Sequence, residues 1–121
     1  FDVTTHSESR SGLGVTGKNE ADKVWVIGVD QDQEYLGNYK SKDGKDSNFV
    51  LASSVKEVGV AVKDIANKTK EDKFPGGQVL NYNLKNGGVS LAKDNLSDKT
   101  WKEVEAAKQN IIDGKVTVPE K

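Results

Sequence analysis

Four polar residues follow two apolar runs of the sequence and could together bind a small polar ligand. Asp30 comes directly after residues 24–29, VWVIGV, a run that is typical of a strand buried on both faces. Ser53, Ser54 and Lys56 lie just past the next apolar run, at the expected start of a helix. Ligands of open α/β sheets bind beyond the carboxyl ends of the strands, so we group these residues as one candidate site.

A carboxylate beside a lysine suits one chemistry in particular. The carboxylate of Asp30 can accept two hydrogen bonds from vicinal hydroxyl groups, such as those of a sugar, and these charge-assisted bonds are short and strong. The ammonium group of Lys56 would keep that carboxylate ionised and could donate to the same hydroxyls. The residue types therefore favour recognition of a polyhydroxylated small molecule.

The residues alone leave other interpretations open. Asp30 could be an ordinary turn residue or the cap of the next segment. Lys56, Lys63 and Lys70 are spaced seven apart on one polar face, so Lys56 could be a solvated helix residue. A small α/β nucleoside- or sugar-acting hydrolase could instead use Asp30 and Asp32 as paired carboxylates. Residues two apart share a face only if the strand continues through both, and residues 31–34 are typical of a loop.

The order of the expected elements predicts an α/β fold. A strand at residues 24–29 is followed by a polar, turn-rich segment at residues 31–48, a second strand over FVLASS at residues 49–54, and then a helix. Ser53 and Ser54 could supply the N-cap of that helix, and residues 74–77, FPGG, would terminate it. Its expected apolar stripe comprises Val55, Val58, Val62, Ile65, Ala66 and Thr69.

The last third of the sequence predicts a β-hairpin and a helix. QVLNYNL and GVSLA flank residues 85–88, KNGG, which favour a hairpin closed by an Asn-Gly turn. Ser97 opens a final helix, and Gly114 stands where a left-handed residue would end it. KVTVP, residues 115–119, is expected to form a short closing strand. The stripe of this helix comprises Trp101, Val104, Lys108, Ile111 and Ile112.

Composition excludes several classes of function. The chain has 121 residues and a net charge of -1, so it offers no global field that would attract nucleic acid or an anionic membrane. It has no cysteine, which excludes a disulfide framework, a thiolate metal site and a cysteine nucleophile. It starts at Phe1 and contains no apolar stretch that could span a bilayer. We therefore expect a processed or trimmed chain whose export signal would lie outside it.

Three other motifs fail their context. GLGVTG, residues 12–17, matches a dinucleotide-binding pattern but has no clear strand before it or helix after it. DQDQEYLGNYKS begins like a calcium loop, but Tyr35 replaces the turn glycine and Ser41 the closing glutamate. His6, the single histidine, has no pattern that would bring it to Ser53 or Ser54 as a catalytic triad requires. We expect no metal and no cofactor.

The motifs and their order resemble one family of binding proteins. VWVIGVDQDQ, NFVLASSVKEVGVAVKDIANK, GGQVLNYNLKNGGVSLA and LSDKTWKEVEAAKQNIIDGKVTVP are similar to the C-terminal part of the basic membrane protein (BMP) family, and SGLGV fits its Gly-rich segment. These proteins are substrate-binding lipoproteins of ABC importers, and the characterised members are purine nucleoside receptors. The resemblance is dense from residue 23 to residue 119 and thin before it.

The resemblance implies a fold and a set of site residues. The fold would be a Rossmann-like lobe portion of a periplasmic-binding-protein type I fold, which closes two lobes on a nucleoside. Asp30 and Lys56 would hold the ribose hydroxyls. Gly12, Gly14 and Ser54 are weaker candidates, the glycines through the backbone. The partners would be a purine nucleoside and an ABC permease, and the full-length form would be an extracytoplasmic, lipid-anchored protein without catalysis.

The chain also departs from the family pattern. A full member is much longer, and Glu8-Ser9-Arg10 stands where the family has a double glycine. We therefore expect residues 1–121 to form a single partial α/β domain, with residues 1–22 divergent and Gly-rich, that carries one wall of the site. Alone it would bind weakly or not at all, and an inactive fragment stays an alternative. Uncovered apolar surface would favour self-association.

Overall fold

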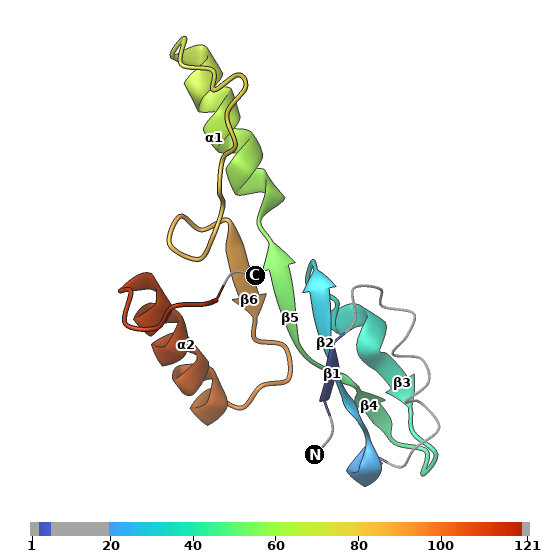
Figure 1. Ribbon diagram of the computed structural model, residues 1–121. Helices are drawn as coiled ribbons and strands as arrows, with labels where there is room; N and C mark the ends of the chain where they lie inside the picture. The colour runs from blue at the N-terminus through green and yellow to red at the C-terminus, as the bar shows by residue number, and fades with distance from the viewer. Residues whose placement is uncertain (1–2, 6–19, 120–121) are drawn as a thin grey trace. The chain divides into compact units, whose positions relative to one another are not determined.

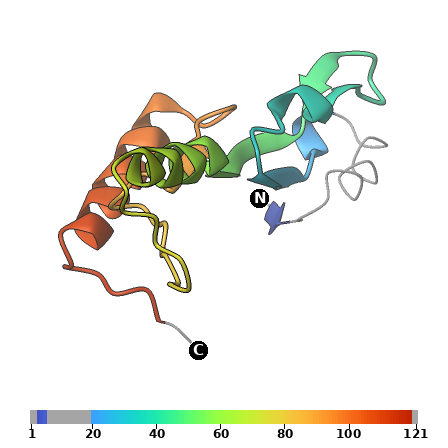
Figure 2. The same cartoon turned by 90° about the horizontal axis from the view of Figure 1, so that it is seen from above.

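The computed structural model describes residues 3–5 and 20–119, and these fall into two compact units. Among the described residues, the first unit comprises 3–5, 20–55 and 91–102, and the second comprises 56–90 and 103–119. Figures 1 and 2 show the elements of both units from two directions.

Strands that lie far apart in the sequence form one mixed sheet. In the described part of the chain its order is β1 (Val3–Thr5), β2 (Trp25–Asp30), β5 (Val50–Lys56) and β6 (Val89–Ala92). The pairs β1–β2 and β2–β5 are parallel, as the sequence pattern of buried, continuously apolar strands requires. The arrow of β6 runs opposite to that of β5 (Figure 1), which makes β6 an antiparallel edge strand. The α/β class predicted from the sequence is confirmed.

The core of the first unit lies beneath the start of β5. Val26, Phe49, Val50 and Ala52 are buried, and the ring of Tyr39 packs on that of Phe49 at a centroid distance of 5.9 Å. Within β2, Val26 and Gly28 are buried, whereas Trp25, Ile27 and Val29 are half-buried, so the strand expected to be buried on both faces is fully covered on one face and partly covered on the other. The core of this unit is small.

The segment between β2 and β5 is more ordered than the sequence predicts. It contains a 3-10 helix, η3 (Glu34–Gly37), and an antiparallel hairpin of β3 (Asn38–Lys40) and β4 (Asp46–Asn48). Both lie beside β2 in Figures 1 and 2, and a further 3-10 turn, η2 (Glu20–Asp22), precedes β2. The predicted turn at Gly44 is confirmed, with φ at +80°. The two strands were missed because NYK and DSN are short and polar.

Helix α1 (Val58–Lys70) confirms the first predicted helix but not its start. Ser53 and Ser54 are not its N-cap, because β5 continues through them to Lys56. Strand pairing satisfies their backbone groups, so there is no helix end there to cap. Glu57 occupies the N-cap position, and no side-chain cap bond is found there in the described structure.

The predicted apolar stripe of α1 is not buried. Val55 belongs to β5, and Val58 and Val62 are 65% and 62% exposed. No residue of α1 is buried in the described structure. The helix itself was therefore predicted correctly. The burial of its apolar stripe against another element is not observed in the described structure.

The predicted hairpin at residues 78–92 is wrong, although its turn is confirmed. Gly87 adopts φ of +75°, and the amide of Gly88 donates to the carbonyl of Asn83 at 2.9 Å. In the described range 20–119, residues 78–83 form no strand, and β6 pairs with β5 instead. The side chains of Asn83 and Asn86 satisfy backbone groups of this segment, which removes the need for a ladder.

Helix α2 (Asp98–Ile112) has the ends that the sequence predicts. The hydroxyl of Ser97 accepts a bond from the amide of Thr100 at 3.2 Å, which makes Ser97 the N-cap. Gly114 adopts φ of +73°, and the amide of Lys115 donates to the carbonyl of Asn110 at 2.9 Å, which closes the C-terminus. The closing strand predicted at residues 115–119 is not formed in the described structure.

Candidate functional site

Asp30 and Lys56 are the last residues of two adjacent parallel strands. Asp30 ends β2, Lys56 ends β5, and Asp30 is paired in register with Val55. The sequence predicted Asp30 just past its strand and Lys56 at the start of a helix. In the structure each is the last residue of its strand, and the helix starts at Val58. The expectation that both positions share the carboxyl edge of the sheet is confirmed. Their role in ligand binding stays a prediction.

The backbone at Asp30 is unusual. Its φ is +79°, in the left-handed region that residues with a Cβ atom rarely adopt. Aspartate tolerates this region better than most residues because its short polar side chain can bond locally. The side chain is exposed at the end of the strand. Such strained positions persist where the surrounding structure fixes them, and they concentrate at functional sites.

Ser53 and Ser54 point to opposite faces of β5 because successive strand residues alternate. Ser53 is 0% exposed, and its hydroxyl accepts a bond from the amide of Gln33 at 3.1 Å. The same hydroxyl donates to the Oδ2 atom of Asp94 at 2.7 Å. Ser54 is half-buried and in register with Val29, so it shares a face with Lys56 at the strand end. Ser54 therefore stays a ligand candidate, weaker than Asp30 and Lys56, whereas the hydroxyl of Ser53 is bonded within the protein.

The sequence did not single out Gln33 or Asp94. Gln33 is buried, and its Oε1 atom accepts a bond from the amide of Val29 at 3.3 Å. Asp94 follows β6 and adopts φ of +42°. Asp94 is 41 positions from Ser53 in the sequence, so no local pattern connects the two residues. The only local signal was the turn-forming pair Asp94-Asn95 after an apolar run.

Burial raises the pKa of the Asp94 carboxyl, and the neighbouring carboxylates of Asp32 and Glu34 raise it further, whereas the bond from Ser53 lowers it. Asp32 also accepts a bond from the amide of Glu34 at 3.0 Å. Asp32 is therefore engaged with η3 and Asp94. The arrangement does not favour the alternative of a hydrolase that pairs Asp30 with Asp32.

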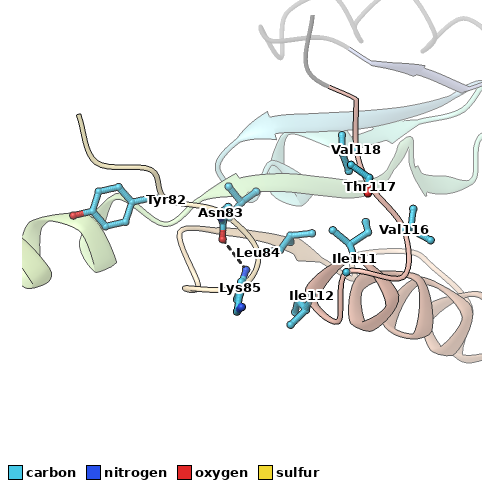
Figure 3. Close-up of a pocket in the computed structure, with 11 residues that line it drawn as sticks. Tyr82, Asn83, Leu84, Lys85, Ile111, Ile112, Val116, Thr117 and Val118 are labelled. Carbon is cyan, nitrogen blue, oxygen red and sulfur yellow. Dashed lines mark hydrogen bonds between the residues drawn. The ribbon is translucent and has the colours of Figure 1, made fainter. Parts of the chain in front are cut away.

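The second unit contains an apolar cavity of about 480 Å³ (Figure 3). It is lined by residues 82–85, by Val89, by the end of α2 and by the segment that follows α2. Figure 3 shows Leu84 and Ile111 on its wall and the bond from the amide of Lys85 to Asn83. None of the described candidates Asp30, Ser54 and Lys56 lines it. The cavity has few polar groups that could orient a sugar.

A charged triad links the loop before β6 to α1 within the second unit. Lys68 and Tyr82 both donate to the Oδ2 atom of Asp64, at 2.6 Å and 2.9 Å. The bond from Lys68, followed by that from Tyr82, lowers the pKa of Asp64. Asp64 in turn raises the pKa of Lys68 and of Tyr82. Tyr82 thereby ties the loop before β6 to α1.

The remaining candidates lie outside the described residues or find no support. Gly12, Gly14 and His6 lie outside the described residues. Among residues 3–5 and 20–119, no group of three or more histidine, cysteine, aspartate or glutamate side chains is arranged to hold a metal ion. In the same segments, neither α-helix is long and apolar enough to cross a bilayer.

Two solved structures share the fold of the chain. A structure described as a transcriptional activator of the comK gene from Bacillus halodurans superimposes with a TM-score of 0.72 at 21% identity, over 98% of this chain and 39% of that chain. A solute-binding protein of an ABC transporter system from Aeropyrum pernix K1 gives a TM-score of 0.53 at 22% identity, over 84% of this chain and 35% of that one. The α/β architecture is thus that of a portion of a periplasmic-binding-protein-like fold.

The sequence comparison is more specific. The model of the family described as ABC transporter substrate-binding protein PnrA-like matches residues 1–121, and the chain belongs to this family. The resemblance to the BMP family is thereby confirmed. The family is one of substrate-binding components of ABC transporters.

Relatives with curated names agree with this assignment. The chain is 70% identical over 106 residues to the ABC transporter nucleoside-binding protein BmpA of Lactococcus lactis. The match covers 88% of this chain and 30% of that protein. It is 42% identical to the CD4+ T-cell-stimulating antigen of Listeria innocua, over 99% of this chain and 36% of the antigen. It is 30% identical to basic membrane protein A of Borreliella burgdorferi, over 98% of this chain and 34% of that protein. The chain therefore spans about a third of the length of these relatives.

Proposed function

We propose that this chain supplies the ribose-side wall of the nucleoside site in a substrate-binding component of an ABC importer. One observation carries the proposal: Asp30 and Lys56 end two adjacent parallel strands whose register pairs Asp30 with the residue before Lys56. Ligands of α/β sheets bind at that edge. The name of the Lactococcus lactis relative, a nucleoside-binding protein, supports the ligand class.

The two side chains suit the vicinal hydroxyls of ribose. The Asp30 carboxylate accepts bonds from the 2′ and 3′ hydroxyls, and the Lys56 ammonium group donates to one of them. No bond of the ligand is made or broken in this arrangement. The proposed activity is therefore binding without catalysis and without a metal or cofactor.

The remaining features of the proposal concern the longer protein. The chain would form one partial α/β domain, and a second lobe would close over the base of a purine nucleoside, since a clamp needs both jaws. Gly12, Gly14 and Ser54 would add weaker contacts. An ABC permease would receive the nucleoside, and a lipid anchor would hold the protein at the outer face of the cytoplasmic membrane.

Binding of matched nucleoside analogues tests the proposal. The assay compares inosine with 2′,3′-dideoxyinosine by calorimetry, on this chain and on a chimera in which it replaces the matching segment of the Lactococcus lactis protein. We expect the dideoxy analogue to bind at least about tenfold more weakly, because it lacks the hydroxyls that a charged partner would hold. Asp30→Asn should weaken inosine binding about tenfold and remove the preference over the dideoxy analogue.

Two results would contradict the proposal. If the chimera binds both analogues equally, the hydroxyls are not held by this wall. If Asp30→Asn leaves the preference intact, Asp30 is not the residue that holds them. Lys63→Ala, which removes an exposed lysine of α1, is the control and should leave both affinities unchanged. A thermal-shift panel of inosine, adenosine and guanosine then shows whether this chain alone is a competent receptor.

A further inference from the structure

The hydroxyl of Ser53 joins three segments of the first unit. Ser53 lies on β5 with 0% exposure, in register with Gly28 of β2. It accepts a bond from the amide of Gln33 at 3.1 Å and donates one to Asp94 at 2.7 Å. A serine hydroxyl has one proton, so the bond to Asp94 leaves its lone pairs for the amide of Gln33.

The bond from Gln33 closes the turn that follows β2. The amide of Gln33 binds Ser53, and its side-chain Oε1 atom accepts from the amide of Val29 at 3.3 Å. Asp30 lies between these two anchored residues. The turn is therefore held from both sides, which is the condition under which a φ of +79° at Asp30 can persist.

Gly28 provides the space for this arrangement. A Cβ atom at position 28 would lie 2.7 Å from the Ser53 hydroxyl oxygen and 2.9 Å from the Gln33 Oε1 atom. Both distances are shorter than atoms tolerate, so the hydroxyl and the amide occupy the volume that a larger residue would fill. Glycine at this position is thus required by the bonds of Ser53 and Gln33 rather than by its own backbone.

We propose that Ser53 is a positioning residue, oriented by Asp94, that aims the Asp30 carboxylate at the ribose hydroxyls. The inference rests on the proposed function, because fixing the turn after β2 matters for binding only if Asp30 holds the ligand. Ser53 itself does not touch the ligand. It acts through Gln33, whose anchored amide fixes where the turn leaves β2.

The test compares the affinity of the chimera for inosine with its affinity for 2′,3′-dideoxyinosine. Ser53→Ala removes the hydroxyl and should lower the inosine affinity about tenfold, while the dideoxy affinity changes less than about twofold. A merely structural role would lower both affinities together. Ser47→Ala, the same change on β4 of the first unit, should leave the ratio as it is.

Two substitutions at Asp94 test whether the Ser53 hydroxyl must be oriented by an acceptor, while the hydroxyl itself stays in place. Asp94→Asn retains an oxygen that can accept from Ser53 and should keep most of the preference for inosine. Asp94→Ala leaves the Ser53 hydroxyl without this acceptor and should reduce the preference about threefold. If Ser53→Ala fails to fold, as judged by circular dichroism, the ratio of these two variants decides the question.

The outcomes distinguish this inference from the proposed function. If Asp30→Asn abolishes the preference for inosine but Ser53→Ala and Asp94→Ala leave it unchanged, Asp30 binds ribose and Ser53 does not position it. If the original chimera shows no preference, the proposed function fails and the inference fails with it. A selective loss of inosine affinity in Ser53→Ala, retained in Asp94→Asn, supports both.

Discussion

Asp94 holds a carboxylate in a partly buried position beside two others. Burial, Asp32 and Glu34 raise its pKa above the ordinary value, and only the bond from Ser53 opposes them. The folded state therefore binds a proton at Asp94 more tightly than the unfolded state does. As the pH rises from the unfolded pKa through the folded one, stability is lost, and the ionised carboxylate remains a cost at neutral pH.

Asp94→Asn should therefore stabilise the chain at neutral pH. Asparagine removes the charge, retains an acceptor for Ser53, and tolerates the left-handed φ of +42° at this position. The gain should shrink as the pH falls and vanish below the unfolded pKa of 3.8, where the original carboxyl is itself protonated. Melting temperatures of both proteins across this pH range check the expectation. A gain that is independent of pH would contradict the electrostatic cause.

The candidate site was predictable from the sequence only where its signal is local. Asp30 follows its apolar run directly, so the strand end could be predicted. The bond between Ser53 and Asp94 joins residues 41 positions apart, and its formation depends on the pairing of β6 with β5. No spacing rule reports such a pair, which is why the sequence left Asp94 without a role.

At the scale of elements, α2 depends on a local cap at its start. Ser97→Ala removes the hydroxyl that accepts from the amide of Thr100, and should lower the free energy of unfolding by about 1 kcal/mol. Ser97→Asp keeps an acceptor there and should lose less. Urea denaturation checks both variants through a shift of the midpoint at constant slope. An unchanged midpoint in Ser97→Ala would show that α2 does not limit the stability.

The elements divide by the range of the interactions that define them. Ser97 and Gly114 act within one turn of α2, so the sequence predicts both ends of that helix. The start of α1 was misplaced because strand pairing extends β5 through Ser53 and Ser54, and a pairing partner outweighs a capping preference. The predicted hairpin failed for the same reason, since β6 pairs with β5 instead of with residues 78–83.

For the whole molecule, exposed valines on α1 predict self-association. Val58 and Val62 are more than half exposed, and burial of each would contribute about 1.5 to 3 kcal/mol. We expect this chain to form dimers or larger species as its concentration rises, and Val58→Lys with Val62→Lys to shift it toward monomer. Sedimentation velocity measures the distribution. Lys63→Ala is the control, and a chain that stays monomeric at all concentrations would contradict the expectation.

If Asp30 binds ligand as proposed, its conformation sets stability and recognition against each other at a single position. Glycine adopts a φ of +79° without steric cost, whereas aspartate only tolerates it. Selection for stability alone would therefore favour glycine at position 30, whereas the proposed ligand contact requires the acid. Redesign guided only by stability would choose Asp30→Gly and, under the proposed function, would yield a more stable protein without the carboxylate that holds the ribose.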